Sequence, residues 1–185
     1  MVHHKTPSSR RCIAVVGMNA SGKSRFGRKL AEALGMPLID TDDAFEHLHG
    51  NIHVFIDRHG WDAFRSVEEE VVEASLLPGH VVVLGGGAVE SPVVRKALKQ
   101  RARVLWIQAG HKRIQRNLEA ARVRRPEFKH GHHRGAVKSL AEARHPLYAE
   151  VADIALYPHL RFSEQVPMAL KLLGKKGTRG HPKPS

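Results

Sequence analysis

Gly17-Met18-Asn19-Ala20-Ser21-Gly22-Lys23-Ser24 is the stretch that decides the fold of this 185-residue chain. It fits the P-loop pattern, in which a glycine, four residues and a second glycine precede Lys and then Ser or Thr. The apolar residues 13–16 before it predict a buried strand, and residues 24–34 after it predict a helix with one apolar face. Glycines in such a turn let successive backbone N–H groups face phosphate oxygens, and the helix N-terminus adds a partial positive charge. The stretch therefore predicts a nucleoside-triphosphate site.

Two side chains of this stretch carry the chemistry that a triphosphate needs. Lys23 can reach the β- and γ-phosphates, and the Ser24 hydroxyl can ligate Mg²⁺. An ordinary glycine-rich turn is the alternative, and the strand and helix patterns on either side argue against it. The residues expected to contact the nucleotide are Gly17, Asn19, Ala20, Ser21, Gly22, Lys23, Ser24 and Arg25. Of these, we expect Lys23 to be catalytic and Ser24 to be a metal ligand.

The composition is typical of a single α/β domain. Hydrophobic residues make up 42% and charged residues 26% of the chain, as in ordinary globular proteins. No apolar run approaches the ~20 residues of a membrane span, and no signal-peptide core is present, so we expect no membrane partner. The single Cys12 excludes an internal disulfide framework, which agrees with the cytoplasmic location that we expect.

A formal net charge of +12 raises the question of a nucleic-acid partner. Residues 1–11 hold three Lys or Arg and residues 171–185 hold five, with no acidic residue in either segment. Residues 111–134 carry a further local charge of +6, which leaves the rest of the chain about neutral. A basic segment that faces a P-loop is better explained by triphosphate than by DNA. We therefore expect no nucleic-acid partner, with only a contact through the tails left open.

Strand and helix patterns alternate along the middle of the chain. Residues 13–16, 37–39, 81–84, 104–107 and 154–157 predict strands. Residues 24–34, 44–49, 52–59, 61–77, 92–100, 112–121, 136–151 and 163–173 predict helices, with an interruption near Pro146. This alternation predicts an α/β fold with a five-stranded parallel sheet and helices on both faces.

The position of these elements divides the chain into three parts. Residues 1–11 are expected to form a disordered basic N-terminal segment. Residues 12–173 are expected to form the folded domain, and residues 174–185 a flexible basic tail.

Asp40 and Asp42 follow the second predicted strand. Because they are two residues apart, an extended backbone would point both carboxylates to the same side. Ligands bind at the carboxyl ends of the strands in such sheets. One carboxylate can help to hold Mg²⁺ through water, and the other can accept a proton from an attacking hydroxyl. The alternative is that Asp42 only caps the following helix.

Gly85-Gly86-Gly87 ends the third predicted strand. Three glycines there cost backbone entropy and offer no packing, so we expect a ligand or another backbone to lie close to them. Arg65 stands earlier in the chain, and its spacing to Glu68 and Glu69 is also that of an ordinary helical ion pair.

Taken in order, these segments resemble shikimate kinase across about residues 12–173. The resemblance is carried by Gly17–Ser24, residues 39–42, residues 64–69, residues 85–88, Arg125-Pro126 and residues 144–148. It implies ATP-dependent phosphorylation of the 3-hydroxyl of shikimate, in aromatic amino-acid biosynthesis. It also implies Mg²⁺ as cofactor and a P-loop kinase fold with a mobile lid at about residues 122–133.

The resemblance also assigns the reacting groups. Asp42 would bind the shikimate hydroxyls and act as the base, and Asp40 would support Mg²⁺ beside Ser24. Arg125 would be the lid arginine that moves onto the phosphates, and so both catalytic and nucleotide-binding. The lid departs from the family, because residues 127–130 read Glu-Phe-Lys-His where an apolar pair is usual.

Four further residues are assigned to the acceptor in the same way. Arg65 and Arg144 would clamp the carboxylate of shikimate, and Gly86 and Gly87 would contact shikimate through their backbone. We expect a monomer whose partners are the small molecules ATP and shikimate. A gluconate or nucleoside-monophosphate kinase is the alternative, and so is a catalytically silent kinase-like binding module.

Overall fold

The computed structural model describes residues 11–121, 134–157 and 160–174. The strands are β1 (Cys12–Val16), β2 (Leu38–Asp40), β3 (Val81–Val83), β4 (Ala102–Ile107) and β5 (Ile154–Leu156). They form one sheet in the order β2-β3-β1-β4-β5, and every neighbouring pair is parallel. The predicted five-stranded parallel sheet is confirmed.

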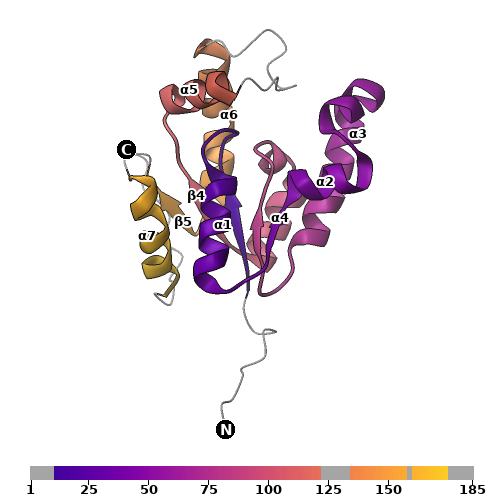
Figure 1. Cartoon of the computed structure of the whole chain (residues 1–185). Helices are drawn as coiled ribbons and strands as arrows, with labels where there is room; N and C mark the ends of the chain where they lie inside the picture. Colours follow the sequence, from indigo (N-terminus) through magenta and orange to yellow (C-terminus); the bar gives the residue numbers. More distant parts are fainter. Residues whose placement is uncertain (1–10, 122–133, 158–159, 175–185) are drawn as a thin grey trace.

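Helices cover both faces of this sheet (Figure 1). They are α1 (Lys23–Leu34), α2 (Thr41–His49), α3 (Ile52–Ser75), α4 (Pro92–Arg101), α5 (His111–Ala121), α6 (Arg134–Val151) and α7 (Phe162–Gly174), with the short 3₁₀ helix η2 (Ala88–Glu90). Successive side chains of a strand point to opposite faces. Ile13 and Val15 therefore pack with α1 and α7 in one core, whereas Ala14 and Val16 pack with α4 and α6 in the other.

Local signals place most helix ends. Gly35, at φ 60°, ends α1, and Gly50, at φ 81°, ends α2. The side chain of Asn51 caps α3, and that of Ser91 caps α4. Gly60, at φ 83°, puts a non-helical residue inside α3, which agrees with the two predicted segments 52–59 and 61–77.

Several predicted bounds differ from those of the structure by one to three residues, and two differences concern β2 and Pro146. The second strand extends one residue further than expected, to Asp40, and the chain turns helical at Thr41. The interruption expected near Pro146 is absent, because α6 continues through it to Val151. A proline costs a helix one hydrogen bond. Here tertiary bonds on either side hold the helix: Arg144 binds Glu90, and the Tyr148 hydroxyl donates to the Gly86 carbonyl at 2.6 Å.

The carboxyl ends of the parallel strands share one edge of the sheet, the upper edge in Figure 1. There α2 and the start of α3 stand on one side and α5 on the other. The expected lid, including Arg125, lies outside the described residues, as do residues 1–10 and 175–185 of the two basic tails. Within the part of the chain that is described, no helix is long and apolar enough to cross a membrane.

Candidate active site

A cavity of about 450 Å³ lies at this edge of the sheet, beside the P-loop. Residues from five separate segments line it, and many of them are charged. They include Asn19, Ser24, Asp40, Asp42, Arg65, Glu68, Gly85, Gly86, Gly87 and Arg144. Most of the residues predicted for metal and acceptor binding therefore meet at one place.

The P-loop is held in a fixed shape. Gly17 and Gly22 have φ angles of 147° and 96°, and Ala20 is a non-glycine residue at φ 61°. A Cβ at Gly17 would lie only 2.6 Å from the carbonyl oxygen of Ile107, so that position requires glycine. Asn117 of α5 donates to the carbonyl of Ala20 at 2.8 Å and ties the loop to that helix.

Lys23 and Ser21 are the buried polar side chains of the loop. Lys23 is 7% exposed, and its amino group donates to the Met18 carbonyl at 3.1 Å across the turn. The Ser21 hydroxyl is buried and has no hydrogen-bond partner among the described residues. A buried polar group without a partner costs free energy that a bound phosphate oxygen can offset. The predicted Arg25 instead lies over the ring of Phe162, 4.0 Å from its centre.

Ser24 and Asp40 form the pair expected at the metal. The Ser24 hydroxyl donates to one carboxylate oxygen of Asp40 at 2.8 Å. The other oxygen of Asp40 accepts from the backbone N–H of Asp42 at 3.1 Å and caps α2. Hydroxyl and carboxylate oxygens are the hard ligands that Mg²⁺ prefers, together with phosphate oxygens and water. The donor set fits Mg²⁺ bound between the protein and a triphosphate.

Asp42 occupies the first turn of α2 rather than an extended segment. The alternative that it only caps this helix is wrong, since Asp40 is the cap. Its carboxylate lines the cavity, and a Cβ at Gly85 would lie 2.6 Å from its Oδ1. That carboxylate therefore lies in the cavity wall, beside Gly85.

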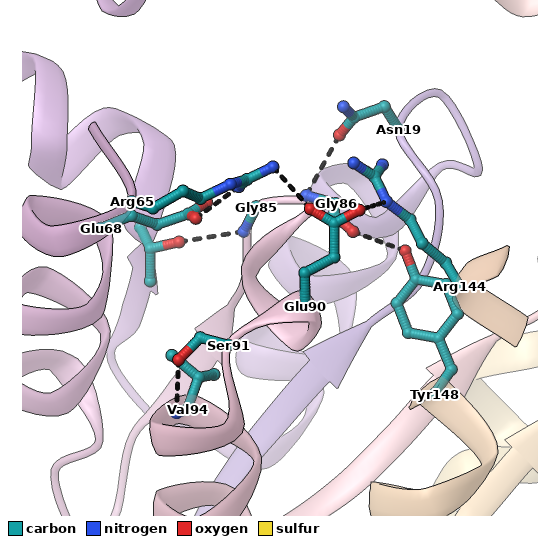
Figure 2. Close-up of polar contacts among 11 residues, drawn as sticks. Asn19, Arg65, Glu68, Gly85, Gly86, Glu90, Ser91, Val94, Arg144 and Tyr148 are labelled. Atoms are coloured by element: carbon teal, nitrogen blue, oxygen red, sulfur yellow. Dashed lines mark hydrogen bonds and ion pairs between the residues drawn. The ribbon is translucent and has the colours of Figure 1, made fainter. Parts of the chain in front are cut away.

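A chain of ion pairs joins α3, η2 and α6 along one wall of the cavity (Figure 2). Arg65 donates from Nη1 to Glu68 at 2.6 Å and from Nη2 to Glu90 at 2.8 Å. Arg144 donates from Nε to the other oxygen of Glu90 at 2.8 Å. The pairing of Arg65 with Glu68, the alternative left open by the sequence, is therefore real, but it lies in the cavity wall.

Arg144 is the more deeply placed of the two arginines. It is 2% exposed, and its Nη1 is buried with no hydrogen-bond partner among the described residues. Burial raises the pKa of the Glu68 carboxyl above its ordinary value, and the Arg65 guanidinium beside it opposes that shift. The arrangement offers an anion one unused, desolvated donor next to a second guanidinium.

The three glycines allow these groups to approach. The N–H of Gly85 donates to the Thr41 hydroxyl at 3.0 Å, and that of Gly86 donates to Asn19 at 3.2 Å. A Cβ at Gly86 would overlap Asn19, and one at Gly87 would overlap the Arg65 guanidinium. The groups that lie close to the glycines are therefore mainly side chains, together with the backbone nitrogen of Asn19, where a ligand or another backbone was expected.

Sequence patterns missed Glu90, Asn117 and Thr41, and assigned no role to Tyr148. Each acts through a partner more than 20 residues away, which no local periodicity encodes. Of these four residues, Thr41 and Tyr148 lie in segments that resemble shikimate kinase, residues 39–42 and 144–148. Arg125 lies outside the described residues.

The chain is similar to known shikimate kinases in sequence and in fold. A family model described as shikimate kinase matches residues 19–169. Shikimate kinase of Paracidovorax citrulli is 36% identical over 172 residues, which cover 88% of this chain and 93% of that protein. A solved structure of shikimate kinase from Acinetobacter baumannii in complex with shikimate has a TM-score of 0.83 and 27% identity, covering 90% of this chain and 94% of that one.

A kinase with a different acceptor is less similar. A gluconokinase from Sinorhizobium meliloti has a TM-score of 0.60 and 18% identity, covering 92% of this chain and 94% of that one. That likeness extends to the fold alone. The family model and the curated relative cover most of the sequence, and the chain belongs to the shikimate kinase family.

Proposed function

We propose that this chain transfers the γ-phosphoryl group of ATP to the 3-hydroxyl of shikimate, giving shikimate 3-phosphate and ADP. ATP-dependent phosphorylation of shikimate is the activity of the family to which it belongs. One observation carries the assignment of the acceptor site. The buried Nη1 of Arg144 has no partner among the described residues, and Arg144 lines a cavity that the P-loop borders.

The nucleotide half of the proposal rests on the P-loop. Its backbone N–H groups and the Ser21 hydroxyl would hold phosphate oxygens, and Lys23 would place its charge between the β- and γ-phosphates. Ser24 and Asp40 would hold Mg²⁺. Mg²⁺ supplies positive charge that neutralises the phosphates and stabilises the leaving oxygen.

The proposed acceptor site has two parts, one that holds the carboxylate of shikimate and one that meets its hydroxyl. Arg65 and Arg144 would hold the carboxylate of shikimate, assisted by the backbone of Gly86 and Gly87. A hydroxyl at the far end of the ring would then face Asp42. As that oxygen bonds to the γ-phosphorus, its proton passes to the Asp42 carboxylate. The bond from the γ-phosphorus to the bridging oxygen breaks, and its electron pair leaves with ADP.

Three finer assignments belong to the same proposal. Arg125 would neutralise charge on the transferred phosphoryl group. The chain would act as a monomer. The cytoplasm is its proposed location, since ATP is supplied there.

A substrate panel tests the proposal. Release of ADP from Mg-ATP is measured in a coupled assay with shikimate, quinate, gluconate and nucleoside monophosphates in turn. We expect turnover with shikimate to exceed that with every other acceptor. Faster turnover with gluconate or a nucleotide would favour the alternative kinase, and no ADP above background with any acceptor would favour a silent binding module.

A further inference from the structure

Glu90 stands at a fixed point between the glycine triplet and α4. Its N–H donates to the Gly87 carbonyl at 2.9 Å, and its own carbonyl accepts from Arg95 at 3.0 Å. The next residue, Ser91, caps α4 through bonds to two backbone N–H groups. The backbone of Glu90 is therefore held on both sides, which fixes where its side chain starts.

The carboxylate of Glu90 joins the two arginines of the cavity wall. One oxygen accepts from Arg65 and the other from Arg144, each at 2.8 Å (Figure 2). Glu90 is the one acceptor that Arg144 has among the described residues. Arg65 has a second carboxylate, Glu68, on its other terminal nitrogen.

Glu90 contacts both arginines but is not among the residues that line the cavity. Arg65 and Arg144 do line it. Its bond to Arg144 uses Nε, at the base of the guanidinium, so that the terminal Nη1 stays unused. On Arg65, by contrast, Glu90 takes the terminal Nη2 and Glu68 takes Nη1, so the terminal donor without a partner among the described residues is on Arg144.

The charges of the two arginines explain why a carboxylate is needed between them. Two guanidinium groups that converge on one anion repel each other before the anion binds, and one of them is almost fully buried. Glu68 and Glu90 supply two negative charges that balance the two arginines. Without Glu90, Arg144 loses both its neutralising charge and the bond that sets the plane of its guanidinium.

We propose that Glu90 is a positioning residue, which sets the two arginines at the spacing and orientation that a substrate carboxylate requires. This role rests on the proposed function and adds to it a residue that never touches the substrate. A site whose supporting groups are loosened binds its ligand less well although every contact residue remains.

The test compares Glu90→Gln and Glu90→Ala with a matched control on α6. Glu150 also bridges two cations, Arg95 at 2.9 Å and Lys99 at 2.6 Å, and its side chain is 41% exposed against 37% for Glu90. Glu150 does not line the cavity. Glu150→Gln therefore removes the same kind of double ion pair outside the cavity, on the Nε of Arg95, whereas the bonds to the Val89 and Glu90 carbonyls come from its Nη1.

We expect Glu90→Ala to raise the Michaelis constant for shikimate roughly tenfold, and Glu90→Gln to raise it by a smaller factor because it keeps one acceptor oxygen. The Michaelis constant for ATP and kcat should change less than about twofold, because the P-loop and Asp42 are untouched. The affinity for shikimate without nucleotide, measured by calorimetry, should fall in the same two variants by similar factors. Glu150→Gln should leave all these values unchanged, and a similar melting temperature in both Gln variants excludes a general loss of structure.

Each other outcome overturns the role. An unchanged shikimate constant in Glu90→Gln and Glu90→Ala would make Glu90 a plain surface ion pair, and a lowered constant would make it a competitor of the substrate. If wild type phosphorylates shikimate and the Glu90 variants do the same equally well, only this inference fails. If wild type neither binds nor phosphorylates shikimate, the proposed function fails, and the inference fails with it.

Discussion

Lys23 places a single charge under the turn of the P-loop, with its amino group 3.1 Å from the Met18 carbonyl. Lys23→Ala should lower turnover by a factor of about 10² or more, since it removes charge from where negative charge moves during transfer. The fold should persist, because the ammonium group interacts with the loop and a ligand rather than with the apolar core. Steady-state kinetics and circular dichroism check both expectations, and near-normal turnover would contradict the P-loop assignment.

Arg65 and Arg144 should act together on one carboxylate. Arg65→Ala and Arg144→Ala should each weaken shikimate binding by roughly 2–5 kcal/mol, because each leaves a desolvated anion half-paired. The double variant should cost less than the sum, since both side chains share one ligand group. Arg65→Lys should recover only part of the loss, because an ammonium group cannot reproduce the planar fork.

The Michaelis constants for shikimate and for ATP measure this effect. The ATP constant should stay near wild type in all of these variants. Arg58→Ala, at an exposed position of the same helix α3, is the matched control and should change neither constant. Unchanged shikimate constants in both single alanine variants would remove the arginine pair from the acceptor site.

Helix α1 depends on one glycine for its close approach to the sheet. A Cβ at Gly27 would overlap the side chain of Val83 on β3, whereas one at Gly135 of α6 would meet nothing within 4 Å among the described residues. Gly27→Ala should therefore lower the free energy of unfolding by about 1–3 kcal/mol. Gly135→Ala should leave it unchanged or raise it by up to ~1 kcal/mol. Urea unfolding compares the two, and equal effects would contradict the close packing of α1.

The elements show what could be predicted from the sequence and what could not. Local chemistry identified the P-loop and the break in the helix at Gly60, since each depends on neighbours in the chain. The continuation of α6 through Pro146 depends on bonds from Arg144 and Tyr148 to other elements. Glu90 was missed for the same reason, because its partners stand 25 and 54 residues away.

The molecule as a whole is built around β1, all five residues of which are buried. Cys12 begins this strand at 1% exposed, and burial raises the pKa of its thiol to about 12. Only the thiolate reacts with disulfide reagents, so native protein at pH 7 should not be labelled. Labelling should follow unfolding of the sheet. Thiol counting with and without denaturant checks this, and rapid labelling of native protein would contradict the burial of the central strand.

Two halves of the site meet only because the sheet brings the P-loop, α2, the glycine triplet and α6 to one edge. The fold thus places the P-loop, Asp42 and the two arginines around one cavity, as the proposed function requires. Such an arrangement predicts one product, phosphorylated at a single hydroxyl.

Phosphorus NMR of a mixture of shikimate, Mg-ATP and the full chain measures that product directly. We predict a single new phosphomonoester signal, coupled to the proton on carbon 3 of shikimate and growing in step with ADP. A Lys23→Ala sample should show almost none over the same time. A signal coupled to another ring proton, or inorganic phosphate and ADP without any phosphomonoester, would contradict transfer to the 3-hydroxyl of shikimate.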